Sequence, residues 1–212
     1  EIWWAVEIRE CAADLELLAP AEQARRKEII RPADRARFTL GTALLRRAAG
    51  RALGIPATDV VIDRACAWCG RPHGRPRLPG TDLHASISHS GDRVAVALAF
   101  GAPVGVDVQR VDPAVAAEIK DQVLGAGEVA EDSLELFVYW TRKEAVVKAT
   151  GDGLTLPLSR VLGTGAGEPP ELRAYPGRPV TAVLRDLDAG AGYTAALAVL
   201  TNEAVQVRSM VT

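Results

Sequence analysis

The chain has 212 residues, of which 48% are hydrophobic and 25% are charged, and its formal net charge is −2. This composition is close to the globular average and excludes a disordered chain, while the length allows one large domain or two small ones. The sequence has no run of about 18 apolar residues, which excludes a membrane-spanning helix. Its three cysteines are too few for a disulfide scaffold. Residues 1–4 lack the basic start of a signal peptide, so we expect a cytoplasmic protein.

Helices and strands are both expected in the first hundred residues. The helix predicted over 32–53 has Pro32 at its start and Gly54 just past its end, the positions that these residue types favour. In chain order the predicted elements are a strand over 2–8, a helix from Pro20, the helix over 32–53, a strand over 60–62, a loop over 63–82 and a strand over 94–100.

The second half repeats this mixture. Val104, Val106 and Val108 alternate, so Asp107 and Gln109 are expected on the opposite face of one strand. In chain order the predicted elements are a strand over 104–109, a helix over 113–123, a helix over 133–150, a loop over 163–179 and a hairpin of strands over 180–184 and 193–199.

The order of these elements shows no steady alternation of strand, helix and strand. It therefore favours an α+β fold over a doubly wound parallel sheet. The turn at Gly101-Ala102-Pro103 suggests a division into an N-terminal half (1–102) and a C-terminal half (103–212). Each half would contain a long helix and a few antiparallel strands.

Positive charge is concentrated between Arg25 and Arg51. This segment contains nine bases and two acids, so it carries about +7, and the rest of the chain carries about −9 by difference. A general nucleic-acid-binding domain is usually basic throughout, so this pattern fits a local anion site better. A solvated, arginine-rich helix face is the alternative.

Two carboxylates could serve a metal ion or act as a base. Glu144 and Lys148 are four residues apart on the helix over 133–150 and share a face, either as an ordinary surface pair or as a carboxylate beside an ammonium. Hard cations such as Mg²⁺ use one or two carboxylates together with phosphate oxygens, which Asp107 and Glu144 could supply. Asp107 could equally be bonded to backbone at the end of its strand.

The segment Ser86-Ile87-Ser88-His89-Ser90-Gly91 combines hydroxyls, an imidazole and backbone amides at the start of a strand. Such a turn could hold phosphate, although an ordinary loop with a bonded histidine is the alternative. Ser88 and His89 are adjacent and point apart on a strand, so they do not form a nucleophile pair.

A basic loop precedes this segment. It contains Arg71, His73, Arg75 and Arg77, and guanidinium groups bind phosphate with two parallel hydrogen bonds. Cys66 and Cys69 are separated by two residues, with His73 close behind, which suggests zinc. Since a structural zinc site usually has four ligands, a loop with two free thiols is the favoured interpretation.

Four motifs occur in a fixed order: His73-Gly-Arg-Pro, Ser88-His89-Ser90, Gly105-Val-Asp-Val-Gln109, and the segment 140–153, which reads WTRKEAVVKATGDG. Together they resemble the Sfp-type 4′-phosphopantetheinyl transferases over residues 20–160. The resemblance implies two pseudo-symmetric α+β halves with the active site in the cleft between them. It also implies transfer of phosphopantetheine from coenzyme A to a serine of an apo acyl or peptidyl carrier protein. Adenosine 3′,5′-bisphosphate would be released.

The resemblance also implies roles for individual residues. Asp107 and Glu144 would hold Mg²⁺, or Mn²⁺, on the pyrophosphate, and Glu144 would act as the base for the carrier serine. Lys148 would stabilise charge on the transferred phosphate. Coenzyme A would be bound by these residues of the first half: Arg25, Arg75, Ser86, Ser88 and His89, with Arg26 and Arg37 as weaker candidates. The motif length favours the monomeric type that serves secondary metabolism, such as antibiotic biosynthesis, rather than the trimeric type.

One residue departs from the family pattern. The strand that usually ends in Asp-x-Glu here ends in Gln109, which offers a carbonyl oxygen but no negative charge. A module that binds coenzyme A or a carrier protein without transfer is therefore the second hypothesis. A zinc-dependent regulatory or nucleic-acid-binding module, based on Cys66 and Cys69, is the third.

Overall fold

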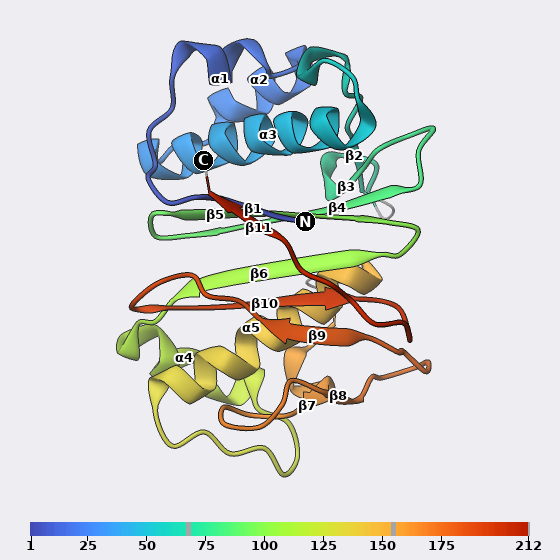
Figure 1. Cartoon of the computed structure of the whole chain (residues 1–212). Helices are drawn as coiled ribbons and strands as arrows, with labels where there is room; N and C mark the ends of the chain where they lie inside the picture. The colour runs from blue at the N-terminus through green and yellow to red at the C-terminus, as the bar shows by residue number, and fades with distance from the viewer. Residues whose placement is uncertain (67–68, 154–155, 212) are drawn as a thin grey trace. The chain divides into compact units, whose positions relative to one another are not determined.

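The computed structural model describes residues 1–66, 69–153 and 156–211. The chain divides into two compact units (Figure 1): unit 1 comprises Glu1–Gly101 and Val207–Thr212, and unit 2 comprises Ala102–Gln206. Each unit contains helices packed on a mainly antiparallel sheet, which confirms the predicted α+β class. Across the described ranges, every helix is too short or too polar to cross a bilayer.

Unit 1 is a four-stranded sheet with the order β11-β1-β5-β4, covered on one face by α3 (Figure 1). A separate hairpin of β2 and β3 lies beside it. In chain order its elements are β1 (Ile2–Ala5), α1 (Ala12–Glu16), α2 (Pro20–Glu28), α3 (Pro32–Leu53), the short helix η1 (Ala57–Asp59), β2 (Asp63–Ala65), β3 (Pro72–Arg77), β4 (Leu83–Ser90), β5 (Arg93–Phe100) and β11 (Ser209–Val211).

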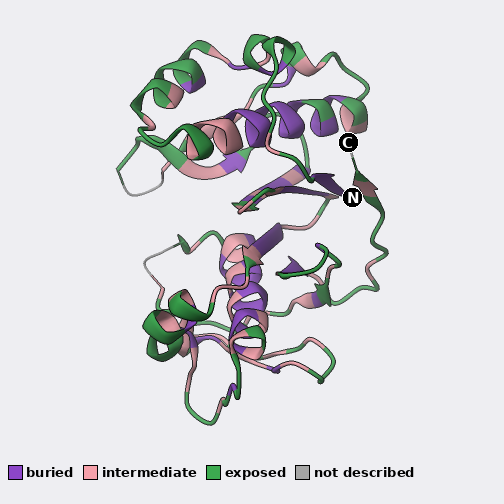
Figure 2. Cartoon of the chain, turned by 90° about the vertical axis from the view of Figure 1, so that its left-hand side faces the viewer, coloured by how far each residue is buried: buried purple, intermediate pink, exposed green. Residues whose placement is uncertain are grey.

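The core of unit 1 forms where the buried side of α3 meets the sheet. Leu44, Leu45 and Ala48 of α3 pack with Val94 and Val96 of β5, and all five are nearly inaccessible to solvent. Figure 2 shows that the middle of α3 is largely buried, and its residues 39–46 are buried on every side of the helix. Small and branched apolar residues on opposing surfaces let the helix lie close to the sheet, so the burial of apolar area stabilises this unit.

Unit 2 is a three-stranded antiparallel sheet with the order β6-β10-β9, packed against α5. In chain order its elements are β6 (Val104–Arg110), α4 (Pro113–Val123), α5 (Ser133–Thr150), the short helix η3 (Leu158–Arg160), β7 (Leu162–Gly163), β8 (Leu172–Ala174), β9 (Val183–Asp186) and β10 (Tyr193–Val199). The start of α5 is capped as its sequence predicts, because the Asp132 carboxylate accepts the backbone N–H of Glu135 at 2.9 Å.

The predicted long helices and central strands are confirmed, whereas the loop predicted over 163–179 contains strand β8. Two predictions for the region 60–82 are also wrong. Residues 60–62 form no strand; instead Val60 is buried in the core of unit 1, and its carbonyl accepts a hydrogen bond from Arg46. The expected loop over 63–82 contains the hairpin of β2 and β3, because the sequence of β3, PHGRPR, has no apolar alternation to reveal a strand.

The C-terminal residues lie with the first unit. The predicted division assigned all residues from 103 onward to one half. In the structure β11 pairs in parallel with β1, so that Trp3 lies opposite Met210. The indole of Trp4 also donates to the hydroxyl of Ser209 at 3.1 Å. Unit 1 is therefore completed by the last residues of the chain.

A buried ion pair joins three segments of unit 2. Lys143 of α5 donates to the carboxylate of Glu128, and the exposed fractions of the two side chains are 2% and 5%. Lys143 also donates to the carbonyl of Val123 at 2.6 Å, while Glu128 accepts the N–H of Gly125 at 2.7 Å and that of Gly163 at 2.8 Å. Burial lowers the pKa of the Lys143 ammonium, and the charge of Glu128 opposes this effect. These contacts fix the segment 123–128 and β7 to α5.

We predict that Glu128→Gln lowers the free energy of unfolding by about 3–5 kcal/mol, because it leaves the Lys143 charge buried without a counter-charge. Chemical denaturation followed by circular dichroism measures this change. The matched control is Arg173→Met, which breaks the exposed pair of Arg173 and Glu168 and should cost less than about 1 kcal/mol. Equal losses in the two variants would contradict the structural role of the Lys143 pair.

Candidate functional site

Strand β6 and helix α5 of unit 2 lie very close together at Gly105. A Cβ atom at this position would lie 1.9 Å from the carbonyl oxygen of Ala145 and 2.5 Å from the amide nitrogen of Ala149. Both are backbone atoms of α5, so only glycine permits this separation of β6 and α5. Because side chains alternate along a strand, residues two positions from Gly105 face the helix as well.

Asp107 lies two residues further along β6 and is 1% exposed. One of its carboxylate oxygens accepts from the Lys148 ammonium at 2.6 Å, and the other accepts from the side-chain amide of Gln109 at 3.1 Å. Lys148 also donates to the backbone carbonyl of Val106 at 3.1 Å. The structure therefore brings Asp107, Gln109 and Lys148 together, with Gln109 on the same side of the strand as Asp107.

Glu144 lies one helical turn before Lys148 on α5 and is half-buried. Burial raises the pKa of the Glu144 carboxyl, the charge of Asp107 raises it further, and Lys148 opposes both effects. Two carboxylates that repel each other in a partly desolvated setting suit a divalent cation, whose charge would relieve the repulsion. The donor set of Asp107 and Glu144 therefore fits Mg²⁺ or a similar hard ion.

The segment Ser86–Gly91 is not the turn that its sequence suggests. Residues through Ser90 belong to β4, the edge strand of its sheet, and pair with β5 in continuous register. Ser86 and Ser88 are 3% and 6% exposed and share one face of the strand, whereas His89 lies on the other face and is exposed. Alternation thus separates His89 from the two serines.

Near Arg75 of β3 lies His84 of β4, a residue that the motifs did not identify. Burial lowers the pKa of the Arg75 guanidinium. His84 of β4 lies near enough that its pKa is lowered, first by burial and then by the charge of Arg75. His84 is two residues before Ser86 and therefore on the same strand face, so the period-two pattern alone could have added it to the candidates.

The basic segment of unit 1 is largely paired within the molecule. Arg26 binds Glu10 at 2.6 Å and the hydroxyl of Thr39 at 2.9 Å. Arg37 binds Asp34 and the carbonyl of Gly91, in the turn between β4 and β5. Further bases of the segment that have a carboxylate partner are Arg25 with Glu28, Arg46 with Glu22, and Arg47 with Asp14. The count of charges therefore overstates the positive charge that a ligand would meet.

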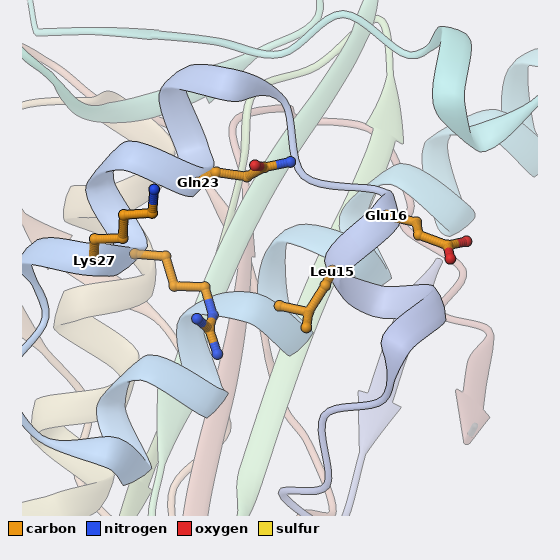
Figure 3. Close-up of a pocket in the computed structure, with 5 residues that line it drawn as sticks. Leu15, Glu16, Gln23 and Lys27 are labelled. Atoms are coloured by element: carbon orange, nitrogen blue, oxygen red, sulfur yellow. The ribbon is translucent and has the colours of Figure 1, made fainter.

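Arg25 is exposed on α2, and neighbouring residues of the same helix line a pocket. Figure 3 shows Leu15 and Glu16 on one side of this pocket and Gln23 and Lys27 on the other, and Arg26 completes the lining. Arg25 and Glu28 are 2.8 Å apart in a pair that is solvent-exposed on both sides, a type that contributes little to stability. The guanidinium of Arg25 can therefore change partners at low energetic cost.

Arg142 is a buried residue of the motif over 140–153 that the sequence did not distinguish. It binds the carboxylate of Asp186 with two hydrogen bonds of 2.8 and 2.6 Å and donates to the carbonyls of Thr164 and Gly165. Like Lys143, it fixes α5 to its surroundings. The motif thus combines two buried structural cations with Glu144 and Lys148, which lie on the side of β6.

Comparison with known families agrees with this geometry. The family model described as the 4′-phosphopantetheinyl transferase superfamily matches residues 103–198. The matched segment contains both β6 and α5, and therefore Asp107, Gln109, Glu144 and Lys148. Ser86, Ser88 and Arg75 precede it.

Individual relatives carry the same name. AcpT of Escherichia coli K12, a 4′-phosphopantetheinyl transferase, is 30% identical over 142 residues, which are 63% of this chain and 67% of AcpT. HetI of Nostoc is 27% identical over 186 residues, 82% of this chain and 78% of HetI. A 4′-phosphopantetheinyl transferase of Bacillus subtilis is 29% identical over 134 residues, but these span 59% of this chain and 56% of that protein. The chain belongs to the 4′-phosphopantetheinyl transferase superfamily, as its motifs predicted.

We predict that Gly105→Ala lowers the free energy of unfolding by about 1–3 kcal/mol, because its methyl group would force β6 away from α5. Chemical denaturation measures the loss. The control is Gly41→Ala in α3, where the new Cβ would lie 3.2 Å from Cγ2 of the Ile87 side chain and meet no backbone atom, so the change should stay within about 1 kcal/mol. An unchanged stability in Gly105→Ala would show that the strand and helix are not in such close contact.

Proposed function

We propose that this protein transfers the 4′-phosphopantetheine group of coenzyme A to a serine of apo acyl or peptidyl carrier proteins, with release of adenosine 3′,5′-bisphosphate. The observation that carries the proposal is the cluster of Asp107, Glu144 and Lys148 across β6 and α5. It lies within the segment that matches the superfamily. Phosphoryl transfer depends mainly on positioning and on neutralising charge, and this cluster supplies groups for both.

The three residues have separate roles in the proposal. Glu144 accepts the proton of the carrier serine, directly or through a water, since a positioned carboxylate can act as a general base. Lys148 places its ammonium on the transferred phosphate. Asp107 orients Lys148 through their 2.6 Å ion pair.

Asp107 and Glu144 would also hold the divalent cation, with Gln109 as a neutral neighbour that offers its carbonyl oxygen. The cation, which we propose to be Mg²⁺, supplies positive charge to the pyrophosphate of coenzyme A when it is bound. Gln109 keeps Asp107 in place by donating to its second oxygen. Metal ligation by Asp107 therefore competes with the hydrogen bonds that it accepts from Lys148 and Gln109.

Residues of unit 1 are proposed to bind the nucleotide and phosphates of coenzyme A. The proposed set consists of Arg25, Arg75, Ser86, Ser88 and His89, of which His89 lies on the opposite face of β4 from the two serines. The proximity of Arg75 and His84, and the shared face of His84, Ser86 and Ser88, support a binding surface along β3 and β4. An active site in a cleft between the two halves, a monomeric state and a cytoplasmic location remain predictions from the sequence.

Intact-mass spectrometry tests the proposed activity. An apo carrier protein is incubated with this protein, coenzyme A and Mg²⁺, and a gain of one phosphopantetheine that EDTA abolishes is expected. If no acyl or peptidyl carrier gains mass although coenzyme A binds, the alternative of a binding module without transfer replaces the proposal.

We predict that Glu144→Gln and Lys148→Ala each lower the rate of transfer by at least about 100-fold, because each removes a charge that the reaction uses. Initial rates at saturating coenzyme A measure the effect. The controls are Glu118→Gln and Lys120→Ala, which make the same changes at exposed positions of α4 and should leave the rate unchanged. Turnover retained in both test variants would contradict the assigned roles.

We further predict that Gln109→Glu lowers the Mg²⁺ concentration for half-maximal activity on the order of tenfold, because it adds a carboxylate to the ligand set. Without Mg²⁺ the same variant should be less stable, since the new charge faces Asp107 and the amide donor is lost. Thermal unfolding with and without Mg²⁺ tests the second effect. A variant whose stability does not respond to Mg²⁺ would place the cation elsewhere.

A further inference from the structure

Three metal-ligating side chains converge at the hairpin of β2 and β3. They are Cys66 and Cys69, which follow β2, and His73 of β3. The two sulfur atoms and a ring nitrogen of His73 all lie within 4.8 Å of one another. The Sγ atom of Cys69 is 2.9 Å from Nε2 of His73. We propose that Cys66, Cys69 and His73 bind a zinc ion.

Backbone hydrogen bonds bring together the segments that carry these three residues. The N–H of Gly70 donates to the carbonyl of Cys66 at 2.9 Å, so the residue after Cys69 lies beside Cys66. Gly70 has φ of +68°, a left-handed conformation that glycine adopts without strain. The N–H of Cys66 donates to the carbonyl of Arg71 at 2.9 Å, so the strand carrying His73 returns beside Cys66.

A second glycine fixes the distance between the two strands. A Cβ atom at Gly74 would lie 3.0 Å from the carbonyl oxygens of Arg64 and Ala65, and 3.1 Å from Cα of Cys66. Because His73 directly precedes Gly74, this close approach keeps the imidazole next to the cysteines. The close contact of the two strands at Gly74 therefore helps to keep the three donor residues near one another.

The donor chemistry selects zinc over the cation proposed for Asp107 and Glu144. Thiolates and imidazole favour borderline-soft ions, whereas Mg²⁺ prefers oxygen ligands. A tetrahedral zinc ion with Zn–S of about 2.3 Å and Zn–N of about 2.0 Å places its ligand atoms about 3.5–3.8 Å apart. Cys69 and His73 are exposed, so a shift of about half an ångström that lengthens their contact meets little resistance.

Binding would release two thiol protons, and the two thiolates would balance the charge of Zn²⁺. Among the residues that the structure describes, three donors form this group, which leaves the fourth position for water or a ligand from outside the chain. The sequence alone favoured two free thiols because a fourth ligand was missing. A zinc ion at an exposed site can take water as its fourth ligand, so a fourth protein ligand is not required.

Metal analysis of the protein without an affinity tag tests the proposal. The reduced protein is given Zn²⁺, desalted and analysed by mass spectrometry, and about one zinc per chain is expected. Cobalt substitution should produce the thiolate-to-cobalt absorption of a tetrahedral site. Cys66→Ser, Cys69→Ser and His73→Ala should each lose stoichiometric zinc and this absorption.

The matched control is Cys11→Ser, which removes the exposed cysteine outside the hairpin and should keep zinc and the cobalt spectrum. Circular dichroism shows whether each variant remains folded. Wild-type protein without stoichiometric metal, a disulfide between Cys66 and Cys69 in its place, or zinc retained by a Cys66→Ser/Cys69→Ser double variant would overturn the proposal. These measurements need neither coenzyme A nor a carrier protein, so their result is independent of the proposed transferase activity.

Discussion

The contact between β6 and α5 at Gly105 determines the geometry of the candidate site. Because a strand and a helix meet there backbone to backbone, residues two positions away on the strand lie directly beside the helix. Asp107 reaches Lys148 for this reason, and the charge of Asp107 acts on Glu144. A wider separation would leave the same three residue types in the sequence without a shared site. The packing of the core and the chemistry of the site therefore depend on one glycine.

Adjacent residues of helix α5 have different roles, some in holding the helix in place and others in the candidate site. Arg142 and Lys143 are buried cations whose partners are Asp186 and Glu128, and they fix the helix to β9, β7 and the segment before α5. Glu144 and Lys148 lie on the side of β6 and form the candidate site. Successive residues of a helix point in directions about 100° apart, so adjacent positions can serve different neighbours. Strong ion pairs on one side thereby hold the functional side chains in position on the other.

The sequence predicted the long helices and central strands correctly because they carry clear periodicity and end signals, as in α3 with Pro32 and Gly54. It failed for β3, whose residues have no apolar alternation and whose strand character comes from pairing with β2. For the candidate site, the spacing of Glu144 and Lys148 predicted a shared face. It could not show that Lys148 pairs with Asp107 across 41 residues of sequence, since the close approach at Gly105 is a property of tertiary packing.

The neutral amide of Gln109 suits its position beside the carboxylate of Asp107. The carboxylate of Asp107 already accepts one hydrogen bond from an ammonium and one from the Gln109 amide, so its charge is compensated without a metal. A glutamate at position 109 would place a further negative charge beside Asp107 and Glu144, and the folded state would then depend on a cation to balance it. The amide removes that dependence and leaves two carboxylates to attract a divalent ion. Under the proposed function, substitution of an acid by its amide would shift the site from one that requires a metal for stability to one that binds the metal together with the phosphates of coenzyme A.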